Sequence, residues 1–282
     1  MKSPTILLLL LAGLCCSFVF MKKKKGPQPV SGKTIEKSIA VVGENLYASK
    51  YEVSNFFYQE FLTELEETGD TKKYEIAKFR KEYWNTEVAY GEPLNSYHTH
   101  PAYDEYPVVN VSHEGANLFC EWLTEKYNSI PKRKFKKVKF RLPSESEWTT
   151  AAKAGRDLAI FPWGGYNVQN SKGQFLANFR TIPQSIIKYN KENEAVVLAD
   201  HAFPAGAARF PAPIKSYLPN DFGLFHMSGN VAEMLAENGR TKGGSWASSG
   251  YYIRIDAEDE YAGFTEPSPK IGFRYFMEVI EE

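Results

Sequence analysis

Cysteine is the residue that this sequence has least of. Only three of its 282 residues are cysteines, and two of them, Cys15 and Cys16, lie in an apolar amino-terminal stretch. Cys120 is alone in the rest of the chain. A single thiol excludes an internal disulfide framework and a four-cysteine zinc site. Cys120 stands in an apolar helical pattern, which predicts a buried and inert thiol rather than a nucleophile.

An excess of charge of either sign is also missing. The chain has 34 lysines and arginines and 34 aspartates and glutamates, so its formal net charge is zero. A nucleic-acid-binding domain usually has a basic face and a high isoelectric point. The composition therefore argues against nucleic acid as a partner. Aromatic residues make up 15% of the chain, enough for a sizeable core, and the 20 glycines and 16 prolines predict many turns.

The amino-terminal segment has no charge between Ser3 and Met21, and Lys22–Lys25 follow it. One interpretation is a secretory signal that ends at a lipid-modified cysteine, Cys15 or Cys16. The other is an uncleaved membrane anchor, since about 20 apolar residues can span a bilayer. Both tether the protein to a membrane. We therefore divide the chain into a signal or anchor at 1–25, a linker at 26–37 and one folded domain at 38–282.

The domain begins with helical patterns. Residues 51–67 predict a helix with Ser54 as its N-cap, and residues 71–84 predict a second, more polar helix. Residues 106–112 are expected to form a short strand that leads into another helix, which Ser112 caps.

Two further signals are local. Ser144 and Glu147 have the spacing of a capping box, in which each side chain binds the other residue's backbone amide. Pro219-Asn220-Asp221 predicts a turn, and Glu233 is expected on a short helix after a second turn. A carboxylate beside such turns can cap a helix, or it can join backbone oxygens around a hard cation.

Taken in order, these segments resemble the formylglycine-generating enzyme family, also called the sulfatase-modifying factor domain. The motifs that carry the resemblance are 52–61, 107–122, 141–152, 162–164, 177–179, 219–233, 242–246 and 271–274. They extend over about residues 38–280. The resemblance implies an α+β fold, a single compact domain related to C-type lectins with little regular secondary structure.

The resemblance also implies that this chain lacks the two catalytic cysteines of the family. Enzymes of this family oxidise a substrate cysteine with two active-site cysteines that bind copper, and the matching positions here are Ser248 and Ile253. Copper in such a site needs thiolate ligands, and residues 241–274 contain no cysteine. We therefore expect no copper cofactor, no catalytic residues and no formylglycine formation. Arg141, Glu147, Trp148 and Arg274 are expected to support the scaffold.

A narrower resemblance concerns residues 100–109, 170–179 and 229–233. These are similar to gliding-motility and type IX secretion lipoproteins of Bacteroidetes, which carry the domain without the cysteine pair. The resemblance implies a lipoprotein on the periplasmic or outer-membrane side of the envelope. It implies other envelope proteins as partners, including components of secretion or motility.

The family also holds structural calcium, and mixed oxygen ligands suit this ion. By resemblance, the first site would use the side chains of Asn178 and Asp200 and the carbonyls of Phe179 and Ala202. The second would use the carbonyls of Gly229 and Val231 with the side chain of Glu233, where His226 stands in place of the usual Asn or Asp. For Glu233, a capping role or a salt bridge with Arg274 is the alternative.

Two other functions remain open. The chain could be an enzyme that reuses the family's groove through Ser248, Ser249 or Tyr251, in which case His226 is a candidate base. It could also bind carbohydrate through a lectin-like scaffold, for which exposed aromatic side chains around an acidic groove would be needed.

Overall fold

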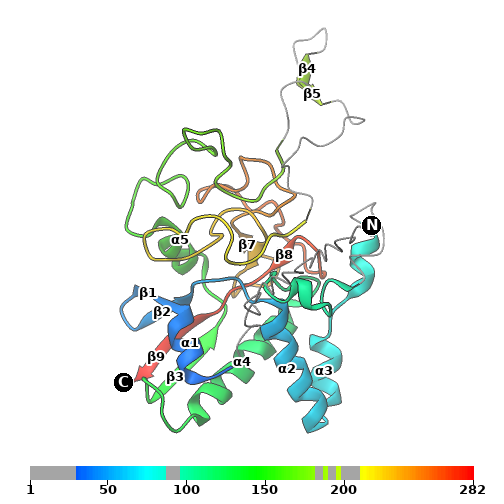
Figure 1. Cartoon of the computed structure of the whole chain (residues 1–282), viewed down its shortest axis with the longest axis vertical. Coiled ribbons are helices and arrows are strands. Elements are labelled where there is room, and N and C mark those ends of the chain that lie inside the picture. Colours follow the sequence, from blue (N-terminus) through cyan, green and yellow to red (C-terminus); the bar gives the residue numbers. More distant parts are fainter. Residues whose placement is uncertain (1–29, 87–95, 182–186, 190–194, 198–209) are drawn as a thin grey trace, which may run out of the picture.

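The computed structural model describes residues 30–86, 96–181, 187–189, 195–197 and 210–282 (Figure 1). Its helices are α1 (Gly32–Ser38), α2 (Asn55–Thr68), α3 (Thr71–Ala77), α4 (His113–Ser129) and α5 (Glu145–Lys153), with short 3-10 turns at Lys81–Thr86 and Pro101–Tyr103. Its strands are β1 (Ile39–Gly43), β2 (Leu46–Ser49), β3 (Lys137–Arg141), β4 (Ile187–Tyr189), β5 (Ala195–Val197), β6 (Ala232–Met234), β7 (Thr241–Lys242), β8 (Ile271–Gly272) and β9 (Phe276–Glu281). The mixture of helices and strands agrees with the expected fold class.

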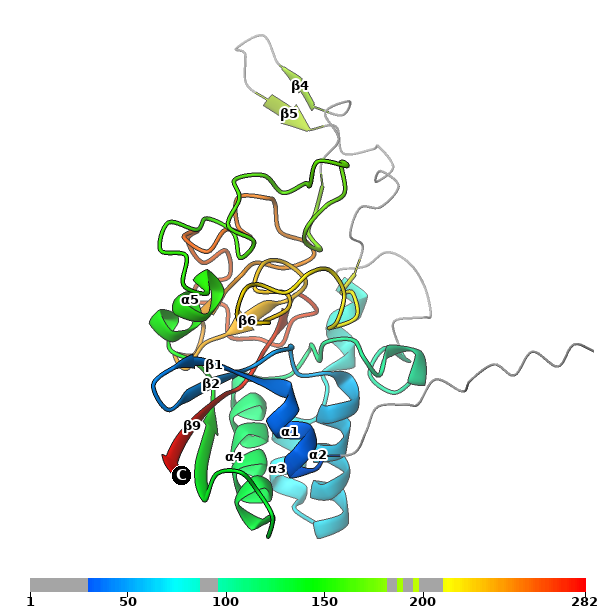
Figure 2. The same cartoon turned by 60° about the vertical axis from the view of Figure 1, so that its left-hand side comes forward.

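A four-stranded antiparallel sheet separates two cores. Its strand order is β1-β2-β9-β3, so β9 pairs with β2 on one side and with β3 on the other. Side chains alternate along each strand. Tyr47 and Met277 therefore face the core under α2, α3 and α4, whereas Ala48 and Phe276 face the core under α5. Figure 2 shows these helices on opposite sides of the sheet.

The helices begin where the sequence predicts. Ser54 accepts a hydrogen bond from the Phe57 amide at the start of α2, and Ser112 accepts one from the Gly115 amide at the start of α4. Both bonds satisfy amides that have no partner inside a helix. The predicted capping box of α5 is also present. The aromatic side chains of α2 and α4 meet in the larger core, where Phe57 and Phe119 pack edge to face.

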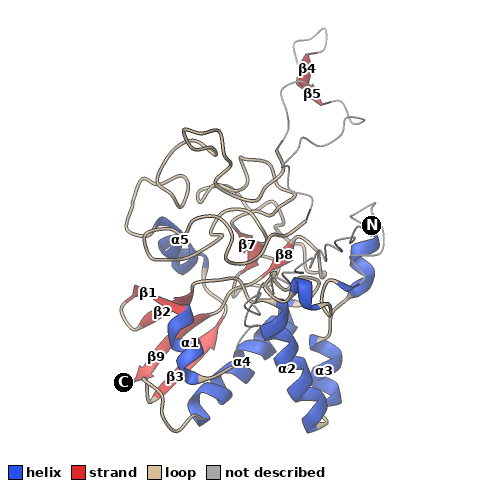
Figure 3. Ribbon diagram, viewed as in Figure 1, coloured by secondary structure: helices blue, strands red, loops and turns tan. Residues whose placement is uncertain are grey.

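Above the sheet, most of the chain is loop (Figure 3). A second, small sheet crosses this region in the order β7-β6-β8, with β6 antiparallel to β7 and parallel to β8. The prediction that Glu233 lies on a short helix is wrong, because Glu233 is the central residue of β6. Ala, Glu and Met all favour helix, but tertiary context overrides such propensities, and pairing with two neighbouring strands decides the conformation here.

Three other expectations need correction. Residues 32–37 of the predicted linker belong to α1, and Ile35 of this helix is buried in the core. The predicted helix at 71–84 ends at Ala77, since Lys78 adopts an extended ψ of 151°. The predicted strand at 106–112 contains only one bridge, between Pro107 and Ser54, because no neighbouring strand pairs with the rest.

Within the described residues, no helix is both long enough and apolar enough to cross a bilayer.

Candidate functional site

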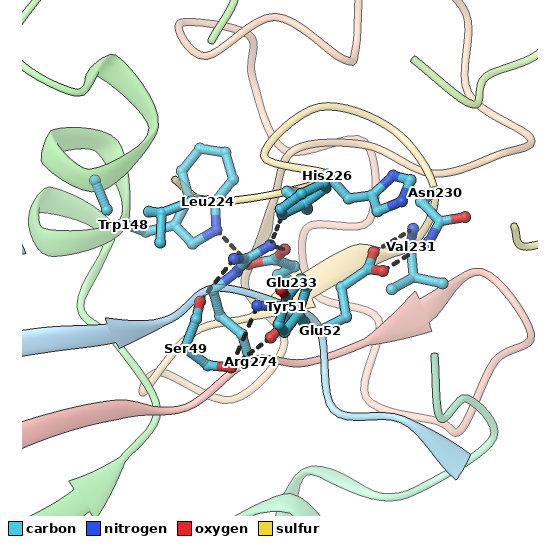
Figure 4. A network of polar contacts seen from close by, with 12 residues as sticks. Ser49, Tyr51, Glu52, Trp148, Leu224, His226, Asn230, Val231, Glu233 and Arg274 are labelled. Atoms are coloured by element: carbon cyan, nitrogen blue, oxygen red, sulfur yellow. Dashed lines mark hydrogen bonds and ion pairs between the residues drawn. The ribbon is translucent and has the colours of Figure 1, made fainter. Parts of the chain in front are cut away.

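Glu233 and Arg274 form a buried ion pair at the centre of the molecule (Figure 4). Neither side chain is exposed to solvent. The Arg274 Nε donates to Glu233 Oε2 at 2.6 Å, and the Trp148 indole nitrogen donates to the same oxygen at 2.7 Å. The remaining guanidinium nitrogens donate to the carbonyls of Ser49 and Phe225. The ion pair proposed for Glu233 as an alternative to calcium is therefore present, and calcium at the second site stays a prediction.

Glu52 is a second buried carboxylate beside this pair, and the sequence had not singled it out as a site residue. Its oxygens accept hydrogen bonds from the Asn230 side chain at 2.6 Å and from the Val231 amide at 3.2 Å. Burial, followed by the nearby charge of Glu233, raises the pKa of Glu52 well above its usual value. Arg274 hydrogen-bonds Glu233 and acts on Glu52 only through its charge. The signal that could have identified Glu52 was a charged residue directly before the buried start of α2.

The first predicted calcium site lies only partly within the described residues. Asn178 and Phe179 are both buried, and the Asn178 amide nitrogen donates to Asn230 Oδ1 at 3.0 Å. Asp200 and Ala202 lie outside the described residues. Gly229 approaches Asn178 so closely, at a φ of +73°, that an added Cβ would lie 2.3 Å from the Asn178 carbonyl oxygen. Asn178 and Gly229, which belong to the two predicted sites, are therefore neighbours.

Ser248 and Ile253, which the sequence resemblance predicts to stand in place of the copper-binding cysteines, are both fully buried. The Ser248 hydroxyl accepts a hydrogen bond from the Ser245 amide at 2.8 Å and donates to the Glu260 carboxylate. Ile253 packs against Phe161 and Phe179 in a small apolar cluster. Ser248 is thus held in a local hydrogen-bond network, and Ile253 serves packing.

His226 does not reach Ser248. Its Nε2 lies 3.1 Å from the Pro213 carbonyl oxygen, and its Nδ1 has no hydrogen-bond partner within the described part of the chain. Burial lowers the pKa of His226 to about 4, so the ring is neutral at pH 7. No hydrogen bond joins Ser249 to His226 among the described residues, and Tyr251 is exposed and packs on Tyr252. The structure therefore does not bring together the serine and the base that the enzymatic alternative needs.

A pocket of about 250 Å³ opens on the far side of Glu52, between α1 and the start of α2. Its walls combine apolar side chains with carboxylates, which the sequence had not predicted. Among the described residues, no group of three or more His, Cys, Asp or Glu side chains could hold a metal ion.

Comparison with known proteins identifies the scaffold. A family profile described as "Sulfatase-modifying factor enzyme 1-like domain" matches residues 25–279. The chain belongs to this family. Among curated relatives of this sulfatase-modifying factor domain, the chain is 27% identical to the formylglycine-generating enzyme of Mus musculus over 217 residues, which is 70% of this chain and 50% of the relative. It is 29% identical to the inactive C-alpha-formylglycine-generating enzyme 2 of Bos taurus over 133 residues, covering 47% of this chain and 33% of the relative.

The sulfatase-modifying factor domain described here thus spans about half the length of the first of these relatives. Solved structures with a similar fold include CarF, with a TM-score of 0.51 at 22% identity over 84% of this chain and 87% of that chain. PvdO from Pseudomonas aeruginosa has a TM-score of 0.50 at 18% identity over 83% of this chain and 80% of that chain. At these identities the likeness concerns the fold alone. The family therefore includes proteins named as enzymes and proteins named as inactive. Membership alone does not tell whether this chain is catalytic, and that question depends on the residues of the site.

Proposed function

We propose that this chain is a non-catalytic member of the sulfatase-modifying factor family that binds other proteins at the cell envelope. One observation carries the proposal: the two positions expected to hold thiolates are Ser248 and Ile253, both fully buried. The only described cysteine, Cys120, is also buried, and burial raises the pKa of its thiol far above the usual range. A protonated, inaccessible thiol is neither a copper ligand nor a nucleophile.

The cellular setting is the second part of the proposal. The charge-free stretch from Ser3 to Met21 and the cysteines within it support tethering as a lipoprotein, with an uncleaved anchor as the alternative. The narrower resemblance of residues 100–109 and 170–179 to lipoproteins of gliding motility and type IX secretion supports a role as an assembly part in one of these systems. An inactive relative among the matches is consistent with a non-catalytic role.

Structural calcium is the third part. Asn178 and Phe179 would hold it with Asp200 and Ala202, and its contribution would be to fix loops. Asn178 fits this role, because its side chain is buried and held by Asn230 in a polar setting.

The relation of the fold to C-type lectins belongs to the same proposal, and Tyr166 and Tyr251 are exposed aromatic side chains that carbohydrate could contact.

The decisive experiment incubates the purified full chain with a cysteine-containing peptide, with and without added copper, and follows the peptide by mass spectrometry. We expect the thiol to remain unchanged in both cases. Conversion of the cysteine to formylglycine would overturn the proposal. In parallel, chemical cross-linking in envelope fractions should join the chain to specific envelope proteins, and a chain that cross-links to none would contradict the binding role.

A further inference from the structure

The pocket between α1 and α2 has the form of a binding site. It has a volume of about 250 Å³, which leaves room for one long side chain. Its apolar walls come from separate parts of the chain and include Ile35, Val53, Phe56, Phe57 and Ile214. Such walls with a few convergent polar groups are typical of a ligand pocket.

Glu60 supplies a charge in this pocket and has no ion-pair partner among the residues that the structure describes. Its two oxygens receive one backbone N–H, that of Val30, at 3.2 and 3.4 Å. A carboxylate can accept about four hydrogen bonds. Lys126, whose charge acts on Glu60, forms its ion pair with Glu64 instead. Partial burial is the largest influence on Glu60 and raises its pKa, which means that its charge is poorly solvated.

The rim of the pocket already holds one ammonium group. The Lys215 Nζ lies 2.6 Å from a carboxylate oxygen of Glu105 and 5.7 Å from the centre of the Tyr51 ring. Glu105, Lys215 and Tyr51 all line the pocket. Carboxylate and aromatic ring together therefore bind a lysine head group at this place, while Glu60 offers a second carboxylate beside the phenylalanines.

We propose that this pocket binds a lysine side chain of a partner protein, with the aliphatic stem against the apolar walls and the ammonium group on Glu60. Lysine suits the pocket because its long stem buries against apolar surface while its head keeps a charge. An anionic or neutral side chain would leave Glu60 without a counter-charge. The inference rests on the proposed role in protein binding and names the chemistry of the partner.

The test titrates the full chain, kept in detergent, with Nα-acetyl-lysine amide and with Nα-acetyl-norleucine amide. Norleucine has the same aliphatic stem without the ammonium group. Methyl NMR signals of Val53 and Ile214 report occupancy of the pocket. We expect the lysine probe to shift these signals with a dissociation constant in about the millimolar range, and the norleucine probe to bind at least about tenfold more weakly.

The variant Glu60→Gln keeps the size of the side chain and removes its charge. It should weaken the lysine probe about tenfold and leave norleucine unchanged. Glu67→Gln is the matched control, because Glu67 lies two turns further along α2 and is exposed outside the pocket. Equal binding of lysine and norleucine, or equal loss in both variants, would overturn the inference, and so would the absence of any shift with the lysine probe.

These outcomes are separate from those of the proposed function. A pocket that fails to bind lysine leaves the cross-linking of envelope partners and the lack of peptide oxidation as they are. Conversely, oxidation of a cysteine peptide would end the non-catalytic proposal without changing the titration.

Discussion

At the scale of single residues, the buried charges dominate the centre of the domain. Glu233 has one arginine and one indole as donors, and Glu52 has no cation of its own. Removing one partner of a buried pair leaves an uncompensated charge in a medium of low polarity. Arg274 is therefore the side chain that contributes most to holding together the segments around Ser49, Phe225 and Glu233.

Replacement of Arg274 by alanine should lower the free energy of unfolding by about 3–5 kcal/mol. Urea denaturation of the full chain measures the change. Arg254→Ala is the control, because Arg254 pairs with Asp256 at the surface, where an ion pair contributes at most about 1 kcal/mol. Similar losses of unfolding free energy in the two variants would show that the buried Glu233–Arg274 pair stabilises the fold no more than a surface pair does.

Glu147 gives a prediction on pH. Hydrogen bonds from Arg141, followed by the amide of Ser144, lower the pKa of Glu147 to about 2 from a usual 4.5. A carboxyl with a lowered pKa in the folded state stabilises the fold above its unfolded pKa, and this contribution is lost as the pH falls. The stability difference between the wild type and Glu147→Gln should thus be full at pH 7 and shrink between about pH 4.5 and pH 2.

Urea midpoints at pH 7 and at pH 3 test this prediction. Glu125→Gln, which removes an exposed carboxylate on α4, serves as the control for the loss of one surface charge. A constant difference between the wild type and Glu147→Gln at both pH values would contradict the assignment.

At the scale of elements, α4 closes one edge of the large sheet. β3 is an edge strand, and free strand edges invite pairing with other chains. The Asn128 side chain accepts a hydrogen bond from the Val138 amide at 3.0 Å and donates one to the Val138 carbonyl at 2.9 Å. The Thr124 hydroxyl accepts a hydrogen bond from the Phe140 amide. Side chains of a helix therefore take the place of a fifth strand.

Asn128→Ala should expose this edge. We expect a loss of about 1–3 kcal/mol in unfolding free energy, because two backbone groups of Val138 lose their partners. Hydrogen exchange of the Val138 amide should become faster, and exchange of amides in β2 should not. Asn117→Ala is the matched control on the same helix, since its amide bonds only within α4, to His113. Unchanged exchange at Val138 would refute this account of the edge.

Local elements could be predicted from the sequence, but their long-range partners could not. Ser54, Ser112 and Ser144 act on amides three residues away, so spacing alone identifies these caps. β6 has three residues, and its conformation depends on β8, which follows about forty residues later. The same limit applies to the site: resemblance identified Glu233 and Arg274, whereas the pocket around Glu60 exists only because α1 packs beside α2.

At the scale of the whole molecule, calcium can be tested on the intact chain. If the first site holds the ion, a chelator should lower the melting temperature by several degrees, because a ligand that binds only the folded state stabilises it. Asp200→Ala should abolish the response, while Asp256→Ala, at an exposed surface pair, should leave it intact. If the chelator does not change the melting temperature of the wild type, the chain holds no structural calcium.

Tethering also belongs to the whole chain. Mass spectrometry of the mature amino terminus should find a lipid-modified Cys15 or Cys16 if the lipoprotein interpretation holds. An intact Met1 would favour the uncleaved anchor instead. A soluble product that lacks the whole segment from Ser3 to Met21 and carries no lipid would exclude both forms of tethering.

The position of β9 has a consequence for how the chain acquires its shape during synthesis. β9 separates β2 from β3, so the two halves of the sheet share no strand pairing until residues 276–281 have been made. Contacts between such distant parts of a chain form slowly. The principal sheet can therefore close only after residues 276–281 have left the ribosome, and a stop codon before Phe276 should leave a product that chaperones retain and proteases remove.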